Sequence, residues 1–452
     1  MLATILEVPI PNALIALSVI AISALFVRSI LPGDRSIDLP GPRGWPIFGS
    51  WFDLGDNWAE HFRQAAKTYG DVRQSFETIY TFLIRADTVC FDFRVLSKSS
   101  AFTIGTSPWN ESTANKRKAA ATALNRPAVQ SYLPIIRQES LDAIRRILKD
   151  GEGGRKGIVP YAYFQRLALN TNFQVNYGFR MEERDDGLFE EIAEVIAKVA
   201  SVRAVTGSLQ DYVPIMRYFP AKSQAAASYG LRRKKFMDKL YDELEQRIAQ
   251  GKDEICITMI WTIGYLAKHP SIQHKAHSEL VTHNPSHQLP DVSSPPQFPY
   301  IHAIAKEASR LFTVFRISLP RTNVRSVVYG NTTIPSGTTF LLNSWACNLD
   351  ASRFPSPMEF RPERFLQSHG VETYSFGVGR RSCPGAFLAL QEIYTTLVFL
   401  IHFFEIEPEG EFEIDPLTAV EDGRGFSVRP RPFRVRCVVR EGVDLSPLGD
   451  AE

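Results

Sequence analysis

The sequence predicts a mainly α-helical fold with small β-sheets, formed by one large domain behind a single N-terminal transmembrane helix. Three observations lead to this prediction: an uncharged N-terminal run, helical periodicity through most of the remaining chain, and strand-like segments that are few and short. At 452 residues the chain could form one large domain or two to three smaller ones. No internal repeat or low-complexity linker divides it, which favours one domain.

The N-terminal segment predicts a membrane anchor. Val8 to Val27 are 20 consecutive uncharged residues, which is the length that a helix needs to cross bilayer hydrocarbon. A cleaved signal peptide is the rival interpretation, but no basic residue precedes the apolar core, because Glu7 lies before it and Arg28 after it. This asymmetry predicts a lumenal N-terminus at 1–7, a transmembrane anchor at 8–28 and a cytosolic remainder.

A proline-rich segment follows the anchor and precedes the large domain. The motif LPGPRGWPIFG cannot form a helix, so residues 29–50 are expected to be a stiff hinge that orients a domain at 51–452. Within that domain, Phe189, Ile192 and Ile196 lie on one helical face. The segment from Ala386 to Phe404 is apolar nearly all round, which predicts a buried helix.

Strand-like segments are short and rich in β-branched or aromatic residues. They are TFLIRA, SVVYG, TTIPSGTTFLLN and FRVRCVVR. Small sheets attached to a helical body suit a flat, buried cofactor better than an open cleft for phosphates.

Charge and cysteine content weigh against several classes of function. The formal charge of +2 comes from 51 basic and 49 acidic residues, so no strong field favours nucleic acid. The five cysteines are scattered, without a CxxC pair or zinc-site spacing, so neither a disulfide framework nor a zinc site is expected. We interpret four of them as small buried apolar side chains and treat Cys383 separately.

Cys383 lies in a glycine-rich loop, FGVGRRSCPG. Gly377, Gly379 and Gly385 permit positive φ and close backbone approach, and a proline fixes the turn into the helix that begins near Ala386. Backbone amides and the dipole at the start of that helix favour a thiolate. Such a thiolate is either an iron ligand or a nucleophile, and the second role needs a histidine base, which is not nearby in the sequence.

The loop resembles the haem-binding loop of the cytochrome P-450 family. The matching pattern F-x-x-G-x-R-x-C-x-G lies at Phe376, Gly379, Arg381, Cys383 and Gly385. The resemblance implies a cytochrome P-450 fold in which Cys383 is the axial thiolate ligand of haem b iron. It also implies that Arg381 neutralises a haem propionate and that Phe376 shields the thiolate.

Two further segments match the same family. Glu307-Ala-Ser-Arg310 has ExxR spacing, which places both charges on one helical face but by itself most often marks an exposed ion pair. The segment FPSPMEFRPERF contains Arg364. By resemblance, Glu307, Arg310 and Arg364 form a buried charge network whose role is structural and not catalytic.

The resemblance covers nearly the whole chain and extends to fungal phenylacetate hydroxylases and their relatives in secondary metabolism. Segments such as TIGTSPWNES, YFQRLALNTN and LFTVFRISLPRTN carry it. It implies contacts with haem propionates in the segments that hold Trp109, Lys116, Arg117 and Arg321. The spacing departs from the usual WxxxR, so Lys116 and Arg117 both remain candidates; an exposed charge or a core tryptophan is the structural alternative for each position.

The same resemblance implies a monooxygenase that hydroxylates a small aromatic acid, or a metabolite derived from an aromatic amino acid, with O2. Electrons would come from NADPH-cytochrome P-450 reductase, with cytochrome b5 as a further candidate donor, at the endoplasmic reticulum membrane. Arg316 is a candidate partner for a substrate carboxylate. A position near a propionate or at the surface is the more conservative interpretation.

The helix expected to activate oxygen departs from the family pattern. The motif (A/G)Gx(D/E)T has no full match in AQGKDEICITMIWTIGYLAKHP, because Glu254 stands where the threonine belongs, and only the 13 residues from Ile255 to Ala267 are uncharged. We therefore predict that this helix, around 253–268, is truncated, either by a real loss or by a misplaced splice junction.

Truncation would affect the chemistry. Without the acid and the hydroxyl, oxygen activation lacks its usual proton delivery, which predicts weak and uncoupled turnover. Thr258 and Thr262 share a helical face and are candidate substitutes, but a hydroxyl bonded back to its own helix is the simpler interpretation. Two alternatives therefore remain: a haem-thiolate enzyme that isomerises or couples its substrates, and a haem-binding protein with impaired activity.

Overall fold

The computed structural model describes residues 41, 55–70, 111–177, 180–181, 190–192, 194–195, 231–232, 254–284, 288–293, 296–319, 321–367, 372–423 and 427–449. The chain divides into two compact units, and the smaller one gathers residues 1–91, 209–219 and 320–340. The predicted anchor, nearly all of the hinge, the TFLIRA strand and Trp109 lie outside the described residues.

The smaller unit contains one described helix and two small antiparallel sheets. Its elements are α2 (Trp58–Tyr69), β1 (Arg321–Thr322), β2 (Val327–Tyr329), β3 (Thr332–Ile334) and β4 (Thr339–Phe340). Strand β1 pairs with β4 and strand β2 pairs with β3. The SVVYG and TTIPSGTTFLLN segments therefore contain short strands, as predicted.

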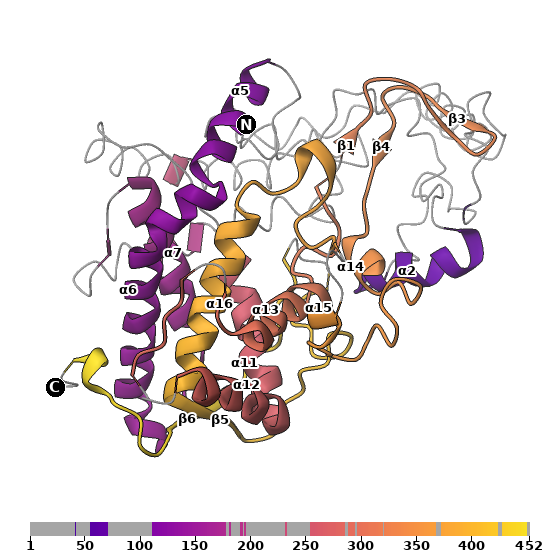
Figure 1. Cartoon of the computed structure of the whole chain (residues 1–452). Coiled ribbons are helices and arrows are strands. Elements are labelled where there is room, and N and C mark those ends of the chain that lie inside the picture. Colours follow the sequence, from indigo (N-terminus) through magenta and orange to yellow (C-terminus); the bar gives the residue numbers. More distant parts are fainter. Residues whose placement is uncertain are drawn as a thin grey trace, which may run out of the picture. The chain divides into compact units, whose positions relative to one another are not determined.

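The larger unit holds most of the described helices (Figure 1). Its helices are α5 (Glu111–Ala123), α6 (Arg126–Asp150), α7 (Tyr161–Tyr177), α11 (Glu254–Lys268), α12 (Pro270–His283), α13 (Pro299–Leu311), α14 (Ser344–Asn348), α15 (Arg364–Gln367) and α16 (Ala386–Phe403). Among the described residues of this unit there are also three 3₁₀ turns, η2 (Glu152–Gly154), η5 (Gly379–Arg381) and η6 (Ser446–Leu448). Strands β5 (Phe404–Glu409) and β6 (Arg434–Val439) form its antiparallel sheet.

Local sequence explains where several of these helices begin. Asn125 caps α6, accepting a hydrogen bond from the Ala128 amide at 2.9 Å. Helices α12 and α13 both begin with a proline, whose fixed φ suits the first helical turn and whose missing amide proton is not needed there.

Helix α16 is the centre of the larger unit. It packs against α6 and α13, and α7 lies against α6 and α11 (Figure 1). Within the described residues it is also the helix that is long and apolar enough to cross a membrane, but 78% of its apolar window is buried inside the protein. Burial of this kind identifies α16 as a core helix, as the apolar run from Ala386 predicted.

A polar seam crosses the interface between α6, α7 and α16. Glu139 of α6 is 1% exposed and accepts a hydrogen bond from Asn170 of α7 at 3.0 Å. Ser140 lies 3.1 Å from Thr396 of α16 through their hydroxyl oxygens. On α16, burial raises the pKa of Glu392 well above its ordinary value. The described helices and the small two-stranded sheets confirm the predicted fold class, mainly α-helical with small β-sheets.

Candidate functional site

The Cys383 loop connects Tyr374 to the start of α16 and is closed by its own backbone. The Cys383 amide donates to the Phe376 carbonyl at 2.8 Å. Gly377 and Gly379 have φ values of 70° and 63°, a region that favours glycine, which explains the glycines on either side of Val378. Gly385 has a φ of −88°, so of the two properties that its glycine permits it does not use positive φ; its Cα lies close to the cysteine, where a Cβ would be 3.8 Å from the Cys383 sulfur.

Apolar packing between α6 and the start of α16 holds the loop from one side. Val129 and Ile136 of α6 are fully buried against Leu388, which lies in the first turn of α16. The Arg126 guanidinium lies over the Phe387 ring, 5.4 Å from its centroid. Because α16 begins directly after the loop, this packing fixes the exit of the chain from Cys383.

Two arginines lie beside the cysteine. Arg117 of α5 donates a hydrogen bond to the Ser382 carbonyl at 2.6 Å, and Lys116, its neighbour in the sequence, is exposed. Burial and the nearby charge of Arg117 lower the pKa of Arg381. Arg117, and not Lys116, is therefore the basic side chain that the structure brings to the cysteine loop.

These side chains fit a haem group. Two neighbouring guanidinium groups repel one another, and two carboxylates such as haem propionates would relieve that repulsion while accepting bidentate hydrogen bonds. The Cys383 sulfur supplies the soft ligand that iron requires, and none of the described cysteines, Cys256, Cys347, Cys383 and Cys437, forms a disulfide. The cysteine sulfur and the two arginines therefore match an iron centre whose organic ligand carries carboxylate groups.

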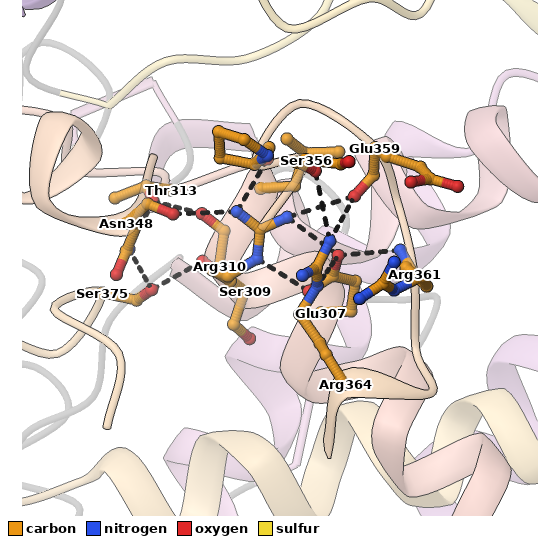
Figure 2. Close-up of polar contacts among 12 residues, drawn as sticks. Glu307, Ser309, Arg310, Thr313, Asn348, Ser356, Glu359, Arg361, Arg364 and Ser375 are labelled. Carbon is orange, nitrogen blue, oxygen red and sulfur yellow. Dashed lines mark hydrogen bonds and ion pairs between the residues drawn. The ribbon is translucent and has the colours of Figure 1, made fainter. Parts of the chain in front are cut away.

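The structure brings Glu307, Arg310 and Arg364 together in a buried charge network (Figure 2). Glu307 and Arg310 lie on α13 and form a two-point pair, with Nε to Oε2 at 2.7 Å and Nη2 to Oε1 at 2.8 Å. Arg364 of α15 reaches Glu307 Oε1 at 3.0 Å. The side chains of Glu307 and Arg310 are 0% exposed and that of Arg364 is 7% exposed.

Backbone carbonyls satisfy the remaining guanidinium donors of the network. Arg310 donates to the carbonyls of Asn348 and Pro357, each at 2.8 Å, and Arg364 donates to the Pro355 carbonyl at 3.0 Å. In the other direction, the Arg361 amide donates to Glu307 at 2.8 Å (Figure 2). The network therefore joins α13 to the loop before α15, and its role is to hold these segments together.

Replacing Glu307 by glutamine should destabilise the protein by about 3–5 kcal/mol, because two buried guanidinium groups then lose their counter-charge. The measurement is chemical unfolding of the full chain. Glu363→Gln is the matched control, since Glu363 belongs to the same segment but pairs with Lys275 at the surface. The control should cost no more than about 1 kcal/mol. Equal stability of the two variants would contradict a structural role for the network.

Arg316 and Arg321 lie in different units. Arg316 is 2% exposed, lies over the Trp345 ring at 4.1 Å from the centroid and donates to the Pro416 carbonyl. The interpretation of Arg316 as a surface residue is therefore wrong. Arg321 is half-buried in strand β1 of the smaller unit and is paired with Phe340 of β4.

The helix predicted to be truncated is α11. The Thr262 hydroxyl donates to the Thr258 carbonyl at 2.7 Å, so it bonds back to its own helix. Trp261 stacks on Phe312, with 5.1 Å between ring centroids, and donates to the Val428 carbonyl at 3.1 Å. These contacts fix α11 in the core.

Sequence reasoning missed one buried side chain near the site. Asn348, in α14, is fully buried, and its side chain contacts two separate segments: Thr313, and Tyr374 with Ser375 immediately before the loop. Figure 2 shows Asn348 beside Thr313 and Ser375. Short-range periodicity carries no signal for such a residue, because its partners are 26 to 35 positions away.

Comparison with known proteins places the chain among haem enzymes. The profile of the family described as Cytochrome P450 matches residues 39–255 and 248–437. A relative from Mycosarcoma maydis named Cytochrome P450 monooxygenase CYP3 is 62% identical, with 97% of this chain and 94% of the relative covered. Phenylacetate 2-hydroxylase of Emericella nidulans is 36% identical over 92% of this chain and 93% of the relative. From the same organism, 3-hydroxyphenylacetate 6-hydroxylase is 32% identical, with 93% and 92% covered.

The family match has a discontinuity at the start of α11, and the alignment with one relative shows that this chain is shorter. The two profile matches meet at 248–255, so the family profile is interrupted there. The alignment with the Mycosarcoma maydis relative spans 506 positions, which exceeds the 452 residues of this chain by 54. At least that many residues of the relative have no counterpart in this chain.

Proposed function

The chain belongs to the cytochrome P450 family of haem-thiolate monooxygenases, and from this premise we propose that it hydroxylates a small aromatic acid. Haem held by a cysteine thiolate would supply oxygen activation, in which one atom of O2 enters a carbon–hydrogen bond and the other is reduced to water by two electrons and two protons. The observation that carries the proposal is the similarity to two hydroxylases whose names specify phenylacetate and 3-hydroxyphenylacetate. A metabolite derived from an aromatic amino acid belongs to the same substrate class.

In this proposal, the residues around the loop have separate roles in binding haem. Cys383 is the iron ligand, and the closed turn from Phe376 holds its backbone in place. Arg381 and Arg117 bind the propionates, which explains two guanidinium groups at one loop. Gly379 gives the loop a positive φ, and Gly385 lies next to the ligand, where a Cβ would be 3.8 Å from the Cys383 sulfur. Trp109 and Arg321 stay candidates for further propionate contacts by resemblance alone.

Arg316 is the candidate for recognising the carboxylate of the substrate. Its guanidinium is buried against Trp345, an environment of low polarity in which a charged partner contributes more than it does in water. Trp345 covers one face of the guanidinium, and the edge, where hydrogen bonds form, donates to the Pro416 carbonyl. A haem propionate is the competing partner for this arginine.

Arg316→Leu should weaken binding of phenylacetate by at least about 30-fold, or about 2 kcal/mol, because the carboxylate would enter the pocket without its counter-charge. The measurement is titration of the haem-loaded chain, followed through the shift of the haem absorption band. Phenylacetamide is the matched ligand and should bind the variant and the unchanged protein with similar affinity.

Arg436→Leu is the control variant, since Arg436 pairs with Glu407 on the exposed side of the β5–β6 sheet. It should leave binding of both ligands unchanged. If Arg316→Leu shows no difference between the acid and the amide, carboxylate recognition by Arg316 is excluded. If neither ligand binds the unchanged protein, the proposed substrate class is wrong.

We further propose that the protein is a single-pass protein of the endoplasmic reticulum membrane with a cytosolic catalytic domain. The uncharged run from Val8 to Val27 and the charge asymmetry around it support this proposal. NADPH-cytochrome P-450 reductase would supply electrons at the same membrane surface, with cytochrome b5 as a second candidate donor.

One observation favours a second candidate function. The interruption of the family profile at 248–255 coincides with the sequence that lacks the oxygen-activation motif. This coincidence supports a truncated distal helix, and with it either non-hydroxylating chemistry or a haem protein of impaired activity. Dependence of product formation on NADPH and reductase separates hydroxylation from isomerisation, which needs no external electrons.

A further inference from the structure

We propose that Asn348 is a positioning residue for the Cys383 loop, connecting that loop to the buried Glu307–Arg310–Arg364 network. The proposal rests on the proposed role of Cys383 as the haem ligand. It assigns to Asn348 no contact with haem or substrate. Its function is to fix the backbone that enters the loop and thereby the place of the sulfur.

Asn348 uses its whole side-chain amide inside the protein. Its Nδ2 donates to the Thr313 hydroxyl at 2.8 Å and to the Ser375 hydroxyl at 3.0 Å. Its Oδ1 accepts from the Tyr374 amide at 2.7 Å. The residue is 0% exposed, so water cannot replace any of these bonds. Figure 2 shows the contacts with Thr313 and Ser375.

The backbone of Asn348 belongs to the charge network. Its carbonyl accepts from Arg310 Nη1 at 2.8 Å, and Arg310 in turn pairs with Glu307. Ser375 supplies a second connection to α13, because its hydroxyl donates to the Ser309 carbonyl at 2.6 Å. Asn348 therefore bonds to the charge network through its main-chain carbonyl and to the entry of the loop through its side chain.

Backbone hydrogen bonds within the loop make the position of Cys383 depend on that of Tyr374. The Gly377 amide donates to the Tyr374 carbonyl at 3.0 Å, and the Cys383 amide donates to the Phe376 carbonyl at 2.8 Å. A shift of Tyr374 and Ser375 therefore moves the carbonyl to which the Cys383 amide is bonded. Since the loop exit is fixed by α16, freedom at its entry changes the direction of the sulfur.

The three contacts require the particular chemistry of asparagine. Two donors and one acceptor must sit on one planar group of this length. Aspartate has no donor when ionised, and alanine or leucine would leave the Tyr374 amide, a buried donor, unsatisfied.

The test compares Asn348→Ala with Asn343→Ala in the full-length, haem-loaded chain. Asn343 is the matched control, because it caps the same helix, accepting from the Ala346 amide at 2.9 Å, and is only half-buried. The first measurement is the absorption band of the ferrous carbon monoxide complex, which distinguishes a thiolate-ligated iron from one whose thiolate has been protonated or lost. The second is hydrogen exchange at the amides of Tyr374 and Cys383, which requires no haem.

We expect Asn348→Ala to convert much of the complex to the form without thiolate and to speed exchange at both amides by about tenfold, the effect of one lost hydrogen bond. Asn343→Ala should do neither. If Asn348→Ala matches Asn343→Ala in both measurements, the proposal is overturned.

A second variant covers the case in which Asn348→Ala does not fold. Ser375→Ala removes only the Ser375 contacts and should give a smaller change of the same kind; no change in either measurement would overturn the proposal. Failure of the unchanged chain to form a thiolate-ligated complex would refute the proposed role of Cys383. The exchange measurement would still decide whether Asn348 orders the loop.

Discussion

Cys383→Ser should abolish the thiolate signature of the ferrous carbon monoxide complex and all reductase-dependent turnover. A serine hydroxyl stays protonated near neutral pH and is a weak neutral donor, so it cannot give iron the electron density that a thiolate gives. The geometry of the loop would survive, because the amide at 383 can still donate to the Phe376 carbonyl. The variant therefore separates ligation from folding.

Cys347→Ser is the matched control for this experiment. Cys347 lies in α14, is half-buried and forms no disulfide. Haem content and the carbon monoxide spectrum, measured on both variants, should show loss of the signature only at position 383. A normal spectrum in Cys383→Ser, or its loss in Cys347→Ser, would refute the assignment of the iron ligand.

The sequence predicts the Cys383 loop well because the determinants are local. Glycines at 377 and 379, a proline after the cysteine and an apolar run after that describe a turn into a buried helix without any long-range contact. The structure has these features, with α16 beginning at Ala386. Which property each glycine uses was not predictable, because a glycine permits both positive φ and close backbone approach, and only the structure shows that Gly385 has negative φ.

Residues whose position depends on distant segments were less predictable. The i,i+3 spacing of Glu307 and Arg310 predicts that they share a face but not that the face is buried, and only family resemblance added Arg364. Lys116 and Arg117 could not be separated, since the choice depends on the rotation of α5 relative to the cysteine loop. No sequence pattern identified Asn348, because its hydrogen-bond partners come together only in the folded chain.

The chain should turn over weakly and with poor coupling, so that electrons from NADPH leave mainly as reduced oxygen species and not as hydroxylated product. Helix α11 has 15 residues, or about 22 Å at the usual rise, and begins at Glu254, beside the interruption of the family profile. Loss of positioned general acid help of this kind typically lowers a rate by ~10²–10⁴. Within α11, Thr262 offers little compensation, since its hydroxyl proton is bonded to the Thr258 carbonyl.

The measurement is the ratio of product formed to NADPH consumed, with reductase present and phenylacetate as substrate. The comparison is with a chain in which the residues present only in the Mycosarcoma maydis relative are inserted at 248–255, the point where the two profile matches meet. We expect the insertion to restore coupling and to raise the rate by a factor within ~10²–10⁴.

Thr262→Ala in the chain without the insertion tests whether another side chain of α11 delivers protons. Its hydroxyl is buried and satisfied, so removing it should leave the low coupling ratio unchanged. A further fall in coupling would instead show that Thr262 delivers protons despite its bond to Thr258. If the chain without the insertion forms nearly one product for each NADPH consumed, oxygen activation does not depend on the absent motif. The truncation would then have no effect on the chemistry.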